Sequence, residues 1–426
     1  MWLKDLRKGE KMEHTKETNY AIGSRTALDE IPEKMYAWTL RSESLGEPIE
    51  AYHKELVDVP EIGDDELLIY NIACGINYNG VWAALGKPKN AVKTHQKYEK
   101  KQDFLICGCE SSGIVCKTGK NVTDFKVGDE VICIGIQYDK NCQVVKETGD
   151  PRLSPSFRIW GYEGNYGAFA QYSKVLAVQC IHKPTELSWE AAAGCSATGG
   201  TVYNMLTHWK GNELKKGDIV LVWGGAGGLG SSAIPLIREM GGIPIAVVSS
   251  DKRGEWCKEL GAYGYINRSE YDHWGMLSDE LFNDENAYKK WLRNNLKIRK
   301  DIYRIAGKKE DPKIVLEHPG RDTLPTSIFL CAKKGMVVLC GATTGYIGSL
   351  DLRYLWLGIR RLQGSHAGFS SDVESYVNII KRKGYPLPEV DVYSFEDIPM
   401  CLQNMYENKK LKGNAVAIIG KKPEDQ

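Results

Sequence analysis

The pattern of apolar and polar positions changes near Thr185. Between about Met35 and that point, short runs that alternate apolar with polar residues are separated by turn signals such as Gly63-Asp64. Two of these runs are Glu66–Cys74 and Glu130–Gly135. This rhythm is typical of an all-β arrangement. After Thr185 the chain alternates helix-like and strand-like segments, which predicts a parallel sheet.

The second region contains several apolar runs of strand length. They cover Ile219–Trp223, Ile243–Val248, Tyr265–Ile266, Ile314–Glu317 and Met336–Cys340. The polar stretch from about Tyr271 to Lys309 carries aromatic and aliphatic residues at helical spacing, which predicts an amphipathic packing face rather than a cofactor site. After His366 come a helix-like segment and the apolar runs Val390–Tyr393 and Ala415–Ile419. We expect these runs to rejoin the first region.

The length of the chain predicts more than one domain. At 426 residues it is longer than a single hydrophobic core normally supports. Residues 1–35 are polar and charged and are expected to form an extension. Residues 36–190 and 367–426 are expected to form a β-rich catalytic domain, and residues 191–366 a dinucleotide-binding domain. The predicted fold class is therefore α/β, with a Rossmann doubly wound parallel sheet beside a β-rich domain.

A glycine cluster follows the first apolar run of the second region. The spacing Gly225-x-Gly227-x-x-Gly230, with Gly228 and Leu229 inside it, suits a tight turn, a close approach of the backbone to a pyrophosphate, and a helix packed on a strand. The pyrophosphate would lie at the helix N-terminus, where free N–H groups favour anions. We therefore predict a dinucleotide site, although a glycine turn formed only for packing has the same pattern.

The end of the next strand is expected to contact the adenosine ribose of the dinucleotide. The sequence there is Ser249-Ser250-Asp251-Lys252-Arg253. Hydroxyl groups and cations suit a 2′-phosphate, whereas NAD is usually held by an acidic residue at this place. Asp251 comes late enough to cap a helix that starts at Lys252. NADP(H) is therefore favoured over NAD(H), while a solvated first helical turn is the plain alternative for the two cations.

Composition and charge narrow the class of partner. The chain has 56 basic and 55 acidic residues, a balance that argues against nucleic acid or a membrane surface as the main partner. No apolar run approaches the ~20 residues that span a bilayer, and the start of the chain lacks the apolar stretch of a signal peptide. A soluble, cytoplasmic protein with a small-molecule substrate is expected.

Cysteine use fits the same picture. There are 12 cysteines, mostly inside apolar runs, where a free thiol behaves as a small hydrophobe. Cys107, Cys109 and Cys116 lack the second Cys pair or nearby His that a structural zinc site needs. A reducing compartment is therefore expected.

A β-rich domain assembled from both ends of the chain around a Rossmann domain resembles the medium-chain dehydrogenase/reductase superfamily, whose catalytic domain is GroES-like. Zinc enzymes of that superfamily hold a catalytic metal with a Cys and a His-Glu pair. Here Cys74 is present, but Cys107-Gly108-Cys109-Glu110 stands where the His-Glu pair would fall. The resemblance therefore implies a zinc-free reductase, with no metal.

Four further motifs narrow the resemblance to the crotonyl-CoA carboxylase/reductase family, also called enoyl-CoA carboxylases/reductases. The motifs are Asn77-Tyr78-Asn79-Gly80-Val81-Trp82, Arg158-Ile159-Trp160-Gly161-Tyr162-Glu163, Glu317-His318-Pro319-Gly320-Arg321, and Arg353-Tyr354-Leu355-Trp356 leading to Gly364-Ser365-His366. The family uses NADPH to reduce an α,β-unsaturated acyl-CoA and traps the resulting enolate with CO2, so that crotonyl-CoA gives ethylmalonyl-CoA.

The resemblance also implies the residues of the CO2 pocket. Asn79 would donate to one CO2 oxygen. His366 would hold a water that contacts the other oxygen, Glu163 would orient that water and the imidazole, and Tyr162 would contribute its backbone and ring. Uncharged donors suit this task because they do not protonate the enolate. Arg353 and Tyr354 match a motif near the CoA channel, and family members are tetramers built as pairs of dimers.

Three departures from the family pattern concern the pocket. Ala367-Gly368 follows His366 where an aromatic is commoner, Cys109-Glu110 replaces a commoner Ser-Asp pair, and the loop from Tyr138 to Phe157 is unusual. These departures leave a reductase expected but bear on how efficiently it carboxylates and which acyl chain it prefers. Two other functions also stay open. One is an enoyl-CoA reductase that protonates the enolate without fixing CO2, and the other is a non-catalytic NADPH-binding protein with a structural or sensing role.

Overall fold

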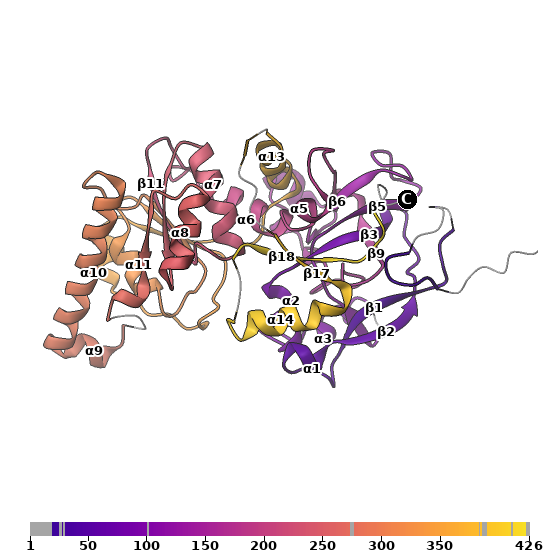
Figure 1. Cartoon of the computed structure of the whole chain (residues 1–426), viewed down its shortest axis with the longest axis horizontal. Coiled ribbons are helices and arrows are strands. Elements are labelled where there is room, and N and C mark those ends of the chain that lie inside the picture. Colours follow the sequence, from indigo (N-terminus) through magenta and orange to yellow (C-terminus); the bar gives the residue numbers. More distant parts are fainter. Residues whose placement is uncertain are drawn as a thin grey trace, which may run out of the picture.

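The computed structural model describes residues 19–24, 28, 30–99, 102–272, 277–382, 384–385, 390–409 and 412–422. Most of the predicted N-terminal extension lies outside these ranges. Two sheet-containing halves lie side by side (Figure 1), one built from the N-terminal half and the C-terminus and the other from the middle of the chain. Among the described residues, no helix is both long and apolar enough to cross a membrane.

The first half is rich in β-structure, as predicted. A three-stranded sheet has the order β2 (His53–Asp58), β1 (Lys34–Arg41), β4 (Phe104–Ile106). A larger sheet has the order β10 (Cys180–His182), β6 (Glu130–Cys133), β5 (Ser111–Thr118), β3 (Glu66–Ile76), β18 (Asn414–Ile418), β17 (Val390–Ser394), with β9 (Tyr172–Leu176) also paired to β3. A short hairpin joins β7 (Ile136–Gln137) to β8 (Arg158–Ile159).

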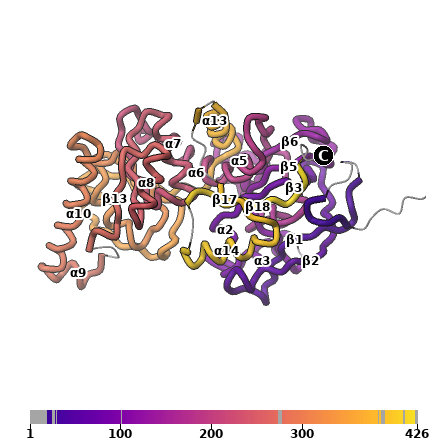
Figure 2. Tube along the Cα trace, in the orientation of Figure 1, coloured from indigo at the N-terminus to yellow at the C-terminus, as the bar shows by residue number. Residues whose placement is uncertain are grey.

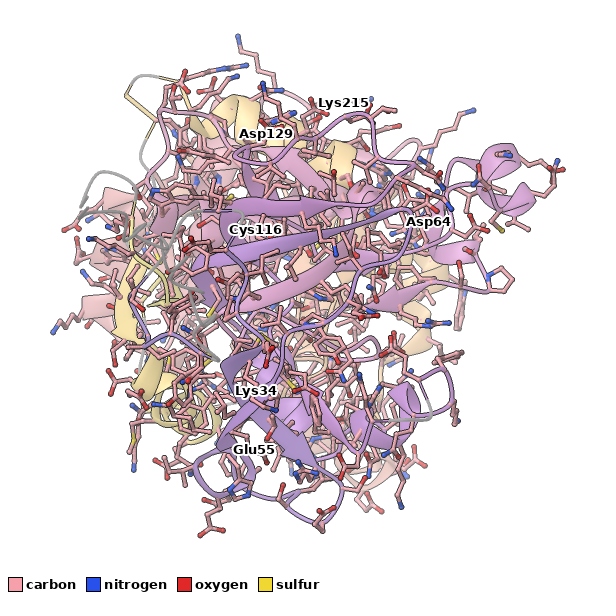
Figure 3. The ribbon with its side chains drawn as sticks, turned by 90° about the vertical axis from the view of Figure 1, so that its right-hand side faces the viewer. Lys34, Glu55, Asp64, Cys116, Asp129 and Lys215 are labelled. Atoms are coloured by element: carbon pink, nitrogen blue, oxygen red, sulfur yellow. The ribbon has the colours of Figure 1, made fainter. Side chains whose placement is uncertain are left out.

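Short helices surround these sheets. They are α1 (Pro48–Ala51), α2 (Tyr78–Ala84), α3 (Ala91–His95), α4 (Gln143–Thr148), α5 (Trp189–Ala193) and α14 (Ile398–Tyr406), with 3₁₀ turns at Pro151–Leu153, Ala177–Gln179 and Phe395–Asp397. Figure 3 looks onto this half, with Lys34 and Glu55 of the β1–β2 pair low on the face and Asp129 at the opposite end.

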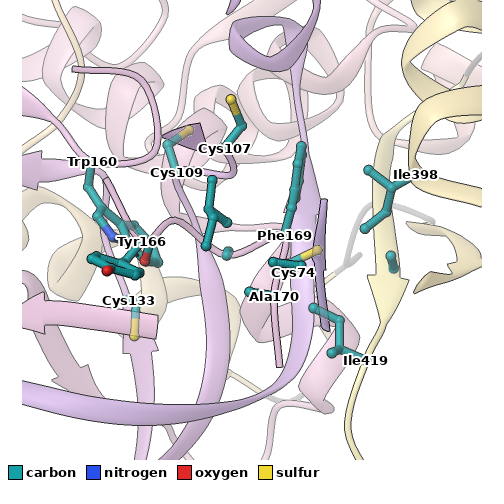
Figure 4. Close-up of a cluster of buried hydrophobic side chains, with 14 of the residues drawn as sticks. Cys74, Cys107, Cys109, Cys133, Trp160, Tyr166, Phe169, Ala170, Ile398 and Ile419 are labelled. Carbon is teal, nitrogen blue, oxygen red and sulfur yellow. Dashed lines mark hydrogen bonds between the residues drawn. The ribbon is translucent and has the colours of Figure 1, made fainter. Parts of the chain in front are cut away.

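Strand β3 is the centre of this half. All but its first residue are buried, which is expected of a strand covered on both faces. The buried side chains around it include Tyr70, Trp160, Phe169 and Phe395, so the core draws on both ends of the chain. Figure 4 shows part of this core, with Phe169 and Cys74 near Ile398 and Ile419 of the C-terminal segment.

The C-terminal runs return to the first half, as predicted. Strand β18 pairs antiparallel with β3 and parallel with β17. In Figure 2 the yellow trace of α14, β17 and β18 lies among the indigo and purple segments of the N-terminal part. The order of strands in the large sheet therefore places a segment from the end of the chain beside one from its first hundred residues.

The second half contains the predicted parallel sheet. Its order is β13 (Gly264–Asn267), β12 (Ile243–Val248), β11 (Ile219–Trp223), β14 (Ile314–Glu317), β15 (Met336–Leu339), β16 (Arg361–Gly364), and every neighbouring pair is parallel. The first strand in sequence, β11, lies in the middle: strands β12 and β13 are added on one side of it and β14, β15 and β16 on the other. A crevice at the carboxyl ends of the strands is expected at such a switch point.

Helices cover both faces of this sheet. They are α6 (Ser196–Thr207), α7 (Gly228–Glu239), α8 (Asp251–Glu259), α9 (Asp279–Asn283), α10 (Glu285–Ala306), α11 (Leu324–Leu330), α12 (Leu352–Leu357) and α13 (Ser370–Ile380), with a 3₁₀ turn at Arg268–Glu270. Val220 and Val222 of β11 pack with residues of α6, α7 and α13, while Leu221 and Trp223 pack with residues of α10 and α11.

The predicted helical stretch from about Tyr271 to Lys309 is interrupted. It contains α9 and α10, each started by a side chain that accepts a backbone N–H: Ser278 from Leu281, and Asp284 from Asn286 and Ala287. Residues 273–276 lie outside the described ranges. Of the residues predicted to form its packing face, Leu277 and Trp291 are buried and Leu281, Tyr288, Leu292 and Tyr303 pack partly buried against the same core, which confirms the packing face, but Leu296 is 43% exposed.

Candidate active site

The glycine cluster forms the turn between β11 and α7, and its glycines differ in their surroundings. A Cβ added to Gly225 would lie 2.6 Å from the Cβ of Ala246, and one added to Gly230 would lie 2.5 Å from the carbonyl oxygen of Gly224. These two glycines therefore allow the helix to pack on the strands. A Cβ on Gly227 would meet only the Gly224 oxygen, at 3.3 Å. The backbone at Gly227 is thus the open part of the turn.

Gly227, Gly228 and Leu229 form the start of α7. Gly227 is the N-cap of α7, and its carbonyl accepts a hydrogen bond of 2.8 Å from the backbone N–H of Ser231. A Cβ on Gly228 would lie 2.3 Å from Oδ1 of Asn414, so the C-terminal segment closes on this turn. Leu229 is half-buried. The free N–H groups of the first turn of α7 are suited to a pyrophosphate.

The residues after β12 present cations at the next strand end. Nη1 of Arg253 donates to Oγ of Ser249 at 2.9 Å, and Lys252 is exposed. Helix α8 begins at Asp251, one residue earlier than predicted, and Ser250 is its N-cap. The carboxylate of Asp251 accepts a 3.0 Å hydrogen bond from Nδ2 of Asn267. The acidic group is therefore engaged in the protein, and the basic groups fit a 2′-phosphate.

A group of amides gathers at the start of α2. Asn77 is the N-cap of this helix, and its Oδ1 accepts from the backbone N–H of Asn79 at 3.1 Å. The thiol sulfur of Cys109 accepts from Nδ2 of Asn77 at 3.0 Å and from Nδ2 of Asn79 at 3.4 Å. Burial raises the pKa of the Cys109 thiol to about 11, so this thiol stays neutral at ordinary pH. Asn79 itself is exposed.

Tyr162 lies near the same place. Its hydroxyl donates to the carbonyl oxygen of Lys87 at 2.5 Å, and burial raises the pKa of the phenol above its usual range. Tyr52 lies nearby: its hydroxyl donates to the carbonyl of Gly80, the residue after Asn79, at 2.8 Å. Burial raises the pKa of this hydroxyl, and Cys107, Cys109 and Tyr162 add to the shift. The hydroxyl of Tyr162 is therefore engaged within the first half.

Glu163 is held at both carboxylate oxygens. One oxygen forms an ion pair with the ammonium group of Lys89, and the other accepts from the backbone N–H of Ile159 at 2.9 Å. Lys89 comes from the segment that follows α2, the helix that carries Asn79. The ion pair therefore ties the Tyr162–Glu163 turn to the Asn79 helix.

His366 follows β16 and comes from the other half of the molecule. Its pKa is lowered, chiefly because the surrounding protein desolvates the ring, although the residue as a whole is exposed; Glu163 opposes this shift, while Arg152 and Lys89 add to it. Glu163, Lys89 and Arg152 are thus the charged groups that influence the pKa of His366. The lowered pKa favours the neutral imidazole.

The aromatic contact of His366 has an unexpected source. The ring of Phe157 packs edge-on against the imidazole, with centroids 5.3 Å apart. Phe157 ends the unusual loop that begins at Tyr138. Ala367, the next residue after His366, has a left-handed φ of 59°, and a Cβ on Gly368 would lie 2.2 Å from the backbone of Gly200. The close approach of Gly368 to Gly200 explains why a small residue stands there. The aromatic contact of His366 comes instead from Phe157 of the loop.

The two halves also meet through aromatic side chains. Trp82 of α2 packs edge-on against Tyr346, which lies between β15 and α12, with centroids 5.9 Å apart. The site residues of the first half therefore face the carboxyl ends of the strands in the second half. Among the described residues, no group of three or more Cys, His, Asp or Glu side chains is arranged to hold a metal ion.

Arg353 and Tyr354 belong to a separate cluster. The guanidinium of Arg353 pairs with Asp351 and donates to the hydroxyl of Tyr288 at 3.1 Å. The hydroxyl groups of Tyr354 and Tyr288 are 3.1 Å apart. Glu163 thus influences the pKa of His366, and Tyr52 contacts Gly80 next to Asn79. Arg353 and Tyr354 instead lie among α10 and α12.

Several residues with contacts at the site were not among the predicted site residues. Lys89, Arg152, Phe157 and Asn77 now belong to the site. Asn77 carried a usable signal, because asparagine is a favoured N-cap residue and stands directly before the helix. Arg152 and Phe157 lie in the unusual loop from Tyr138 to Phe157, but nothing in the sequence indicated that the loop reaches His366. Lys89 carried no signal, since its contact with Glu163 joins segments far apart in the sequence.

Comparisons with known proteins agree with this arrangement. The family described as the alcohol dehydrogenase GroES-like domain matches residues 63–185, and the zinc-binding dehydrogenase family matches residues 228–382. The chain is 40% identical over 401 residues to the crotonyl-CoA carboxylase/reductase of Cereibacter sphaeroides, covering 94% of this chain and 91% of that protein. It is 34% identical over 393 residues to the crotonyl-CoA reductase of Streptomyces avermitilis, covering 89% of this chain and 84% of that protein.

Solved structures of carboxylase/reductases are also similar to this chain. The crotonyl-CoA carboxylase/reductase AntE in complex with NADP has a TM-score of 0.89 and 43% identity, covering 95% of this chain and 99% of that chain. The 2-octenoyl-CoA carboxylase reductase CinF in complex with NADP and 2-octenoyl-CoA has a TM-score of 0.83 and 30% identity, covering 91% and 88%.

Proposed function

The chain belongs to the crotonyl-CoA carboxylase/reductase family of the medium-chain dehydrogenase/reductase superfamily, and from that premise we propose that it catalyses the NADPH-dependent reductive carboxylation of an α,β-unsaturated acyl-CoA. With crotonyl-CoA and CO2 the product is ethylmalonyl-CoA. The protein is an oxidoreductase that acts on a carbon–carbon double bond and fixes CO2 in the same turnover.

The residues at the two strand ends fit NADPH. The open backbone at Gly227 and the first turn of α7 would hold the pyrophosphate, and Ser249, Lys252 and Arg253 would hold the 2′-phosphate. When bound, the cofactor supplies the hydride that is added to the β-carbon of the enoyl thioester. The protein then controls whether CO2 or a proton reaches the α-carbon of the resulting enolate.

The pocket residues are suited to CO2 rather than to a proton. The amide of Asn79 donates a hydrogen bond without giving up a proton, and His366 is favoured in its neutral form. Glu163, the carboxylate beside His366, is paired with Lys89. Tyr162 commits its hydroxyl to the carbonyl of Lys87. None of these groups presents a free acidic proton, and this observation carries the proposal of carboxylation over simple reduction.

Each pocket residue has a proposed role. Asn79 donates to one oxygen of CO2. His366 holds a water that contacts the other oxygen, and Glu163 orients that water and the imidazole. Tyr162 packs its ring and backbone against the bound CO2. The position of Phe157 against His366 supports a fixed orientation of the imidazole.

Arg353 and Tyr354 are proposed to contact the CoA part of the substrate. The side chain of Arg353 is 47% exposed, and aromatic rings of Phe282 and Tyr288 lie beside its guanidinium. A cation with neighbouring aromatic surface suits a nucleotide with phosphates. Asp351 competes for the same guanidinium, so the phosphates would have to displace or share this pair.

We propose that the protein assembles as a homotetramer built from two dimers. Strand β16 ends its sheet, with β15 as its neighbour. Beside it, a group of large apolar side chains is exposed, which we call the α12 patch: Leu352, Trp356, Leu357, Ile359 and Leu362. An exposed apolar patch at a sheet edge is typical of an interface. The domain boundaries at residues 35, 190 and 366 and the cytoplasmic location stay predictions.

The first experiment measures NADPH oxidation with crotonyl-CoA, with and without bicarbonate and carbonic anhydrase, and identifies the products by mass. Ethylmalonyl-CoA as the main product supports the proposal. Butyryl-CoA at saturating CO2 would instead identify a reductase that protonates the enolate. The Streptomyces avermitilis relative is named a crotonyl-CoA reductase. No oxidation of NADPH with any enoyl-CoA would contradict both functions and favour a structural or sensing role.

A further inference from the structure

A buried carboxylate joins the Asn79 helix to α6. Glu110 is only 2% exposed. Its Oε1 accepts from Nδ2 of Asn77 at 3.1 Å, while its Oε2 accepts from Oγ of Ser196 at 3.1 Å and from the backbone N–H of Ala197 at 2.8 Å. Ser196 and Ala197 begin α6. One side chain thus connects the N-terminal ends of two helices that are distant in sequence.

The neighbouring strand leaves space for this side chain. A Cβ added to Gly75 of β3 would lie 2.4 to 2.5 Å from the side-chain atoms of Glu110. Burial raises the pKa of the Glu110 carboxyl, and the hydrogen bonds from Ala197, Asn77 and Ser196 oppose this shift. The start of α6 also favours the charged form through its free N–H groups.

The connection continues from Asn77 to the pocket. The Nδ2 group of Asn77 is shared between Glu110 and the sulfur of Cys109, which leaves Oδ1 of Asn77 free to accept from the backbone N–H of Asn79. The same sulfur accepts from the side-chain amide of Asn79. The orientation of the Asn77 carboxamide therefore sets the position of Asn79 at both its backbone and its side chain.

The connection continues from α6 to the cofactor turn. Oγ1 of Thr198 lies 2.8 Å from Oγ of Ser232 on α7, and it accepts from Nδ2 of Asn414 at 3.2 Å. Asn414 is the residue that packs against Gly228 of the glycine turn. Two sets of hydrogen bonds, joined by the backbone of α6 between Ala197 and Thr198, thus connect the amide of Asn79 to the helix that starts at the pyrophosphate site.

We propose that Glu110 is a positioning residue of the carboxylation pocket. It fixes the amide of Asn79 relative to α6 and the cofactor turn, so that the α-carbon of the enolate meets CO2 before it meets a proton. This inference rests on the proposed function. A purely structural Glu110 would support folding and cofactor affinity without affecting the ratio of carboxylated to protonated product.

The test compares product ratios at a subsaturating, fixed concentration of dissolved CO2. Glu110→Gln replaces one acceptor with a donor, so either Asn77 or the start of α6 loses its partner. We expect the ratio of carboxylated to protonated product to fall about tenfold, the size expected for a lost hydrogen bond to a charged group. The apparent KM for CO2 should rise, while the rate of NADPH oxidation should change by less than about threefold.

A second change separates positioning from stability. In the Glu110→Gln, Asn77→Asp double variant, donor and acceptor exchange places, so the link between positions 77 and 110 is restored and the acceptor for Asn79 N–H remains. We expect the double variant to regain most of the wild-type ratio. Should Glu110→Gln fail to fold, the Asn77→Asp single variant, which sets two carboxylates against each other, should show the same loss.

The control is Glu317→Gln in the second half. Glu317 is also fully buried and accepts three hydrogen bonds, from Ser327, Thr323 and Gly320, but it does not contact Asn77 or Asn79. It should lower the melting temperature without changing the ratio. An unchanged ratio in Glu110→Gln, with a carboxylating wild type, would overturn the inference. A wild type that makes only butyryl-CoA would overturn the proposed function, and the inference with it.

Discussion

The carboxylate of Glu163 is clamped between the ammonium group of Lys89 and the backbone N–H of Ile159. The side chain of Glu163 is 14% exposed, against 50% for Lys89, so the pair lies at the edge of the site rather than in bulk solvent. Besides burial, which is the main cause, Lys89 and Glu163 shift the pKa of His366 with opposite sign.

This relationship predicts how the product ratio depends on pH. Burial lowers the pKa of His366, so the imidazole is neutral at neutral pH and becomes protonated only as the pH falls below the ordinary histidine range. The carboxylated product should therefore be constant near neutrality and decline in acid. Lys89→Met removes a repelling cation, raises the pKa of His366 and moves this decline to higher pH; Glu163→Gln should move it lower.

The measurement is the product ratio between about pH 5 and about pH 8, within the titration range of histidine. Dissolved CO2, rather than total bicarbonate, is held constant, since the two interconvert with pH. Shifts of the same sign in both variants would contradict the assignment.

The pocket residues should control the fate of the enolate more than its formation. Asn79→Ala, Glu163→Gln and His366→Asn each remove a donor or its orientation, and each is expected to lower the ratio of carboxylated to protonated product by about tenfold, while NADPH oxidation slows less. Product masses and the rate of NADPH oxidation are measured on the same samples. An unchanged ratio in all three variants would refute the pocket assignment.

Two glycines of the cofactor turn should respond to alanine in opposite ways. Gly225→Ala forces a methyl group against Ala246 and is expected to cost about 1–3 kcal/mol of the free energy of unfolding. Gly227→Ala has room in the fold but fills the open backbone, so the melting temperature should be retained while the KM for NADPH rises. Equal losses of stability in both variants would disprove this division.

Cofactor choice should depend on Arg253. Arg253→Ala removes a cation held by Ser249 and should raise the KM for NADPH about 10- to 100-fold, with little change for NADH, because only NADPH carries the 2′-phosphate. Lys258→Ala is the matched control on the same helix, since Lys258 pairs with Glu255 instead. If both cofactors weaken equally, Arg253 acts through the fold and not through the phosphate.

The α12 patch should be needed for assembly. Trp356 is 61% exposed in the single chain, and Trp356→Glu would place a carboxylate inside a predicted apolar interface. We expect a smaller oligomer by light scattering after size-exclusion chromatography, with an unchanged circular dichroism spectrum. Lys289→Glu, at an exposed ion pair on α10, is the control. A wild-type chain that is monomeric at micromolar concentration would refute the interface.

The sequence predicted elements whose determinants are local. The strand β11, the glycine turn and β12 could be placed because apolar runs and glycine spacing act over a few residues. The break between α9 and α10 was missed because helical spacing continues across it and only the caps at Ser278 and Asp284 reveal it. The start of α8 was placed one residue late because Asp251 resembles a cap, whereas its carboxylate binds Asn267.

The candidate site could be predicted only in part. Asn79, Tyr162, Glu163 and His366 were named through motifs, but the ion pair of Lys89 with Glu163 and the contact of Phe157 with His366 join separate segments. No spacing rule links such residues. Glu110 illustrates the same limit, because its role depends on space left by Gly75 and on donors from α6.

The place of β18 between β3 and β17 has a consequence for how the chain is made. Ribosomes release the N-terminal segments first, and domains generally fold as units during synthesis. The parallel sheet of the second half is complete before β18 emerges. On the edge of β3 that faces β18, β9 already pairs with Glu66–Tyr70, so only Ala73–Ile76 must wait for β18. Nascent chains therefore carry this short open segment of a buried strand until β18 has been made, and an open strand edge is a place where another chain can pair.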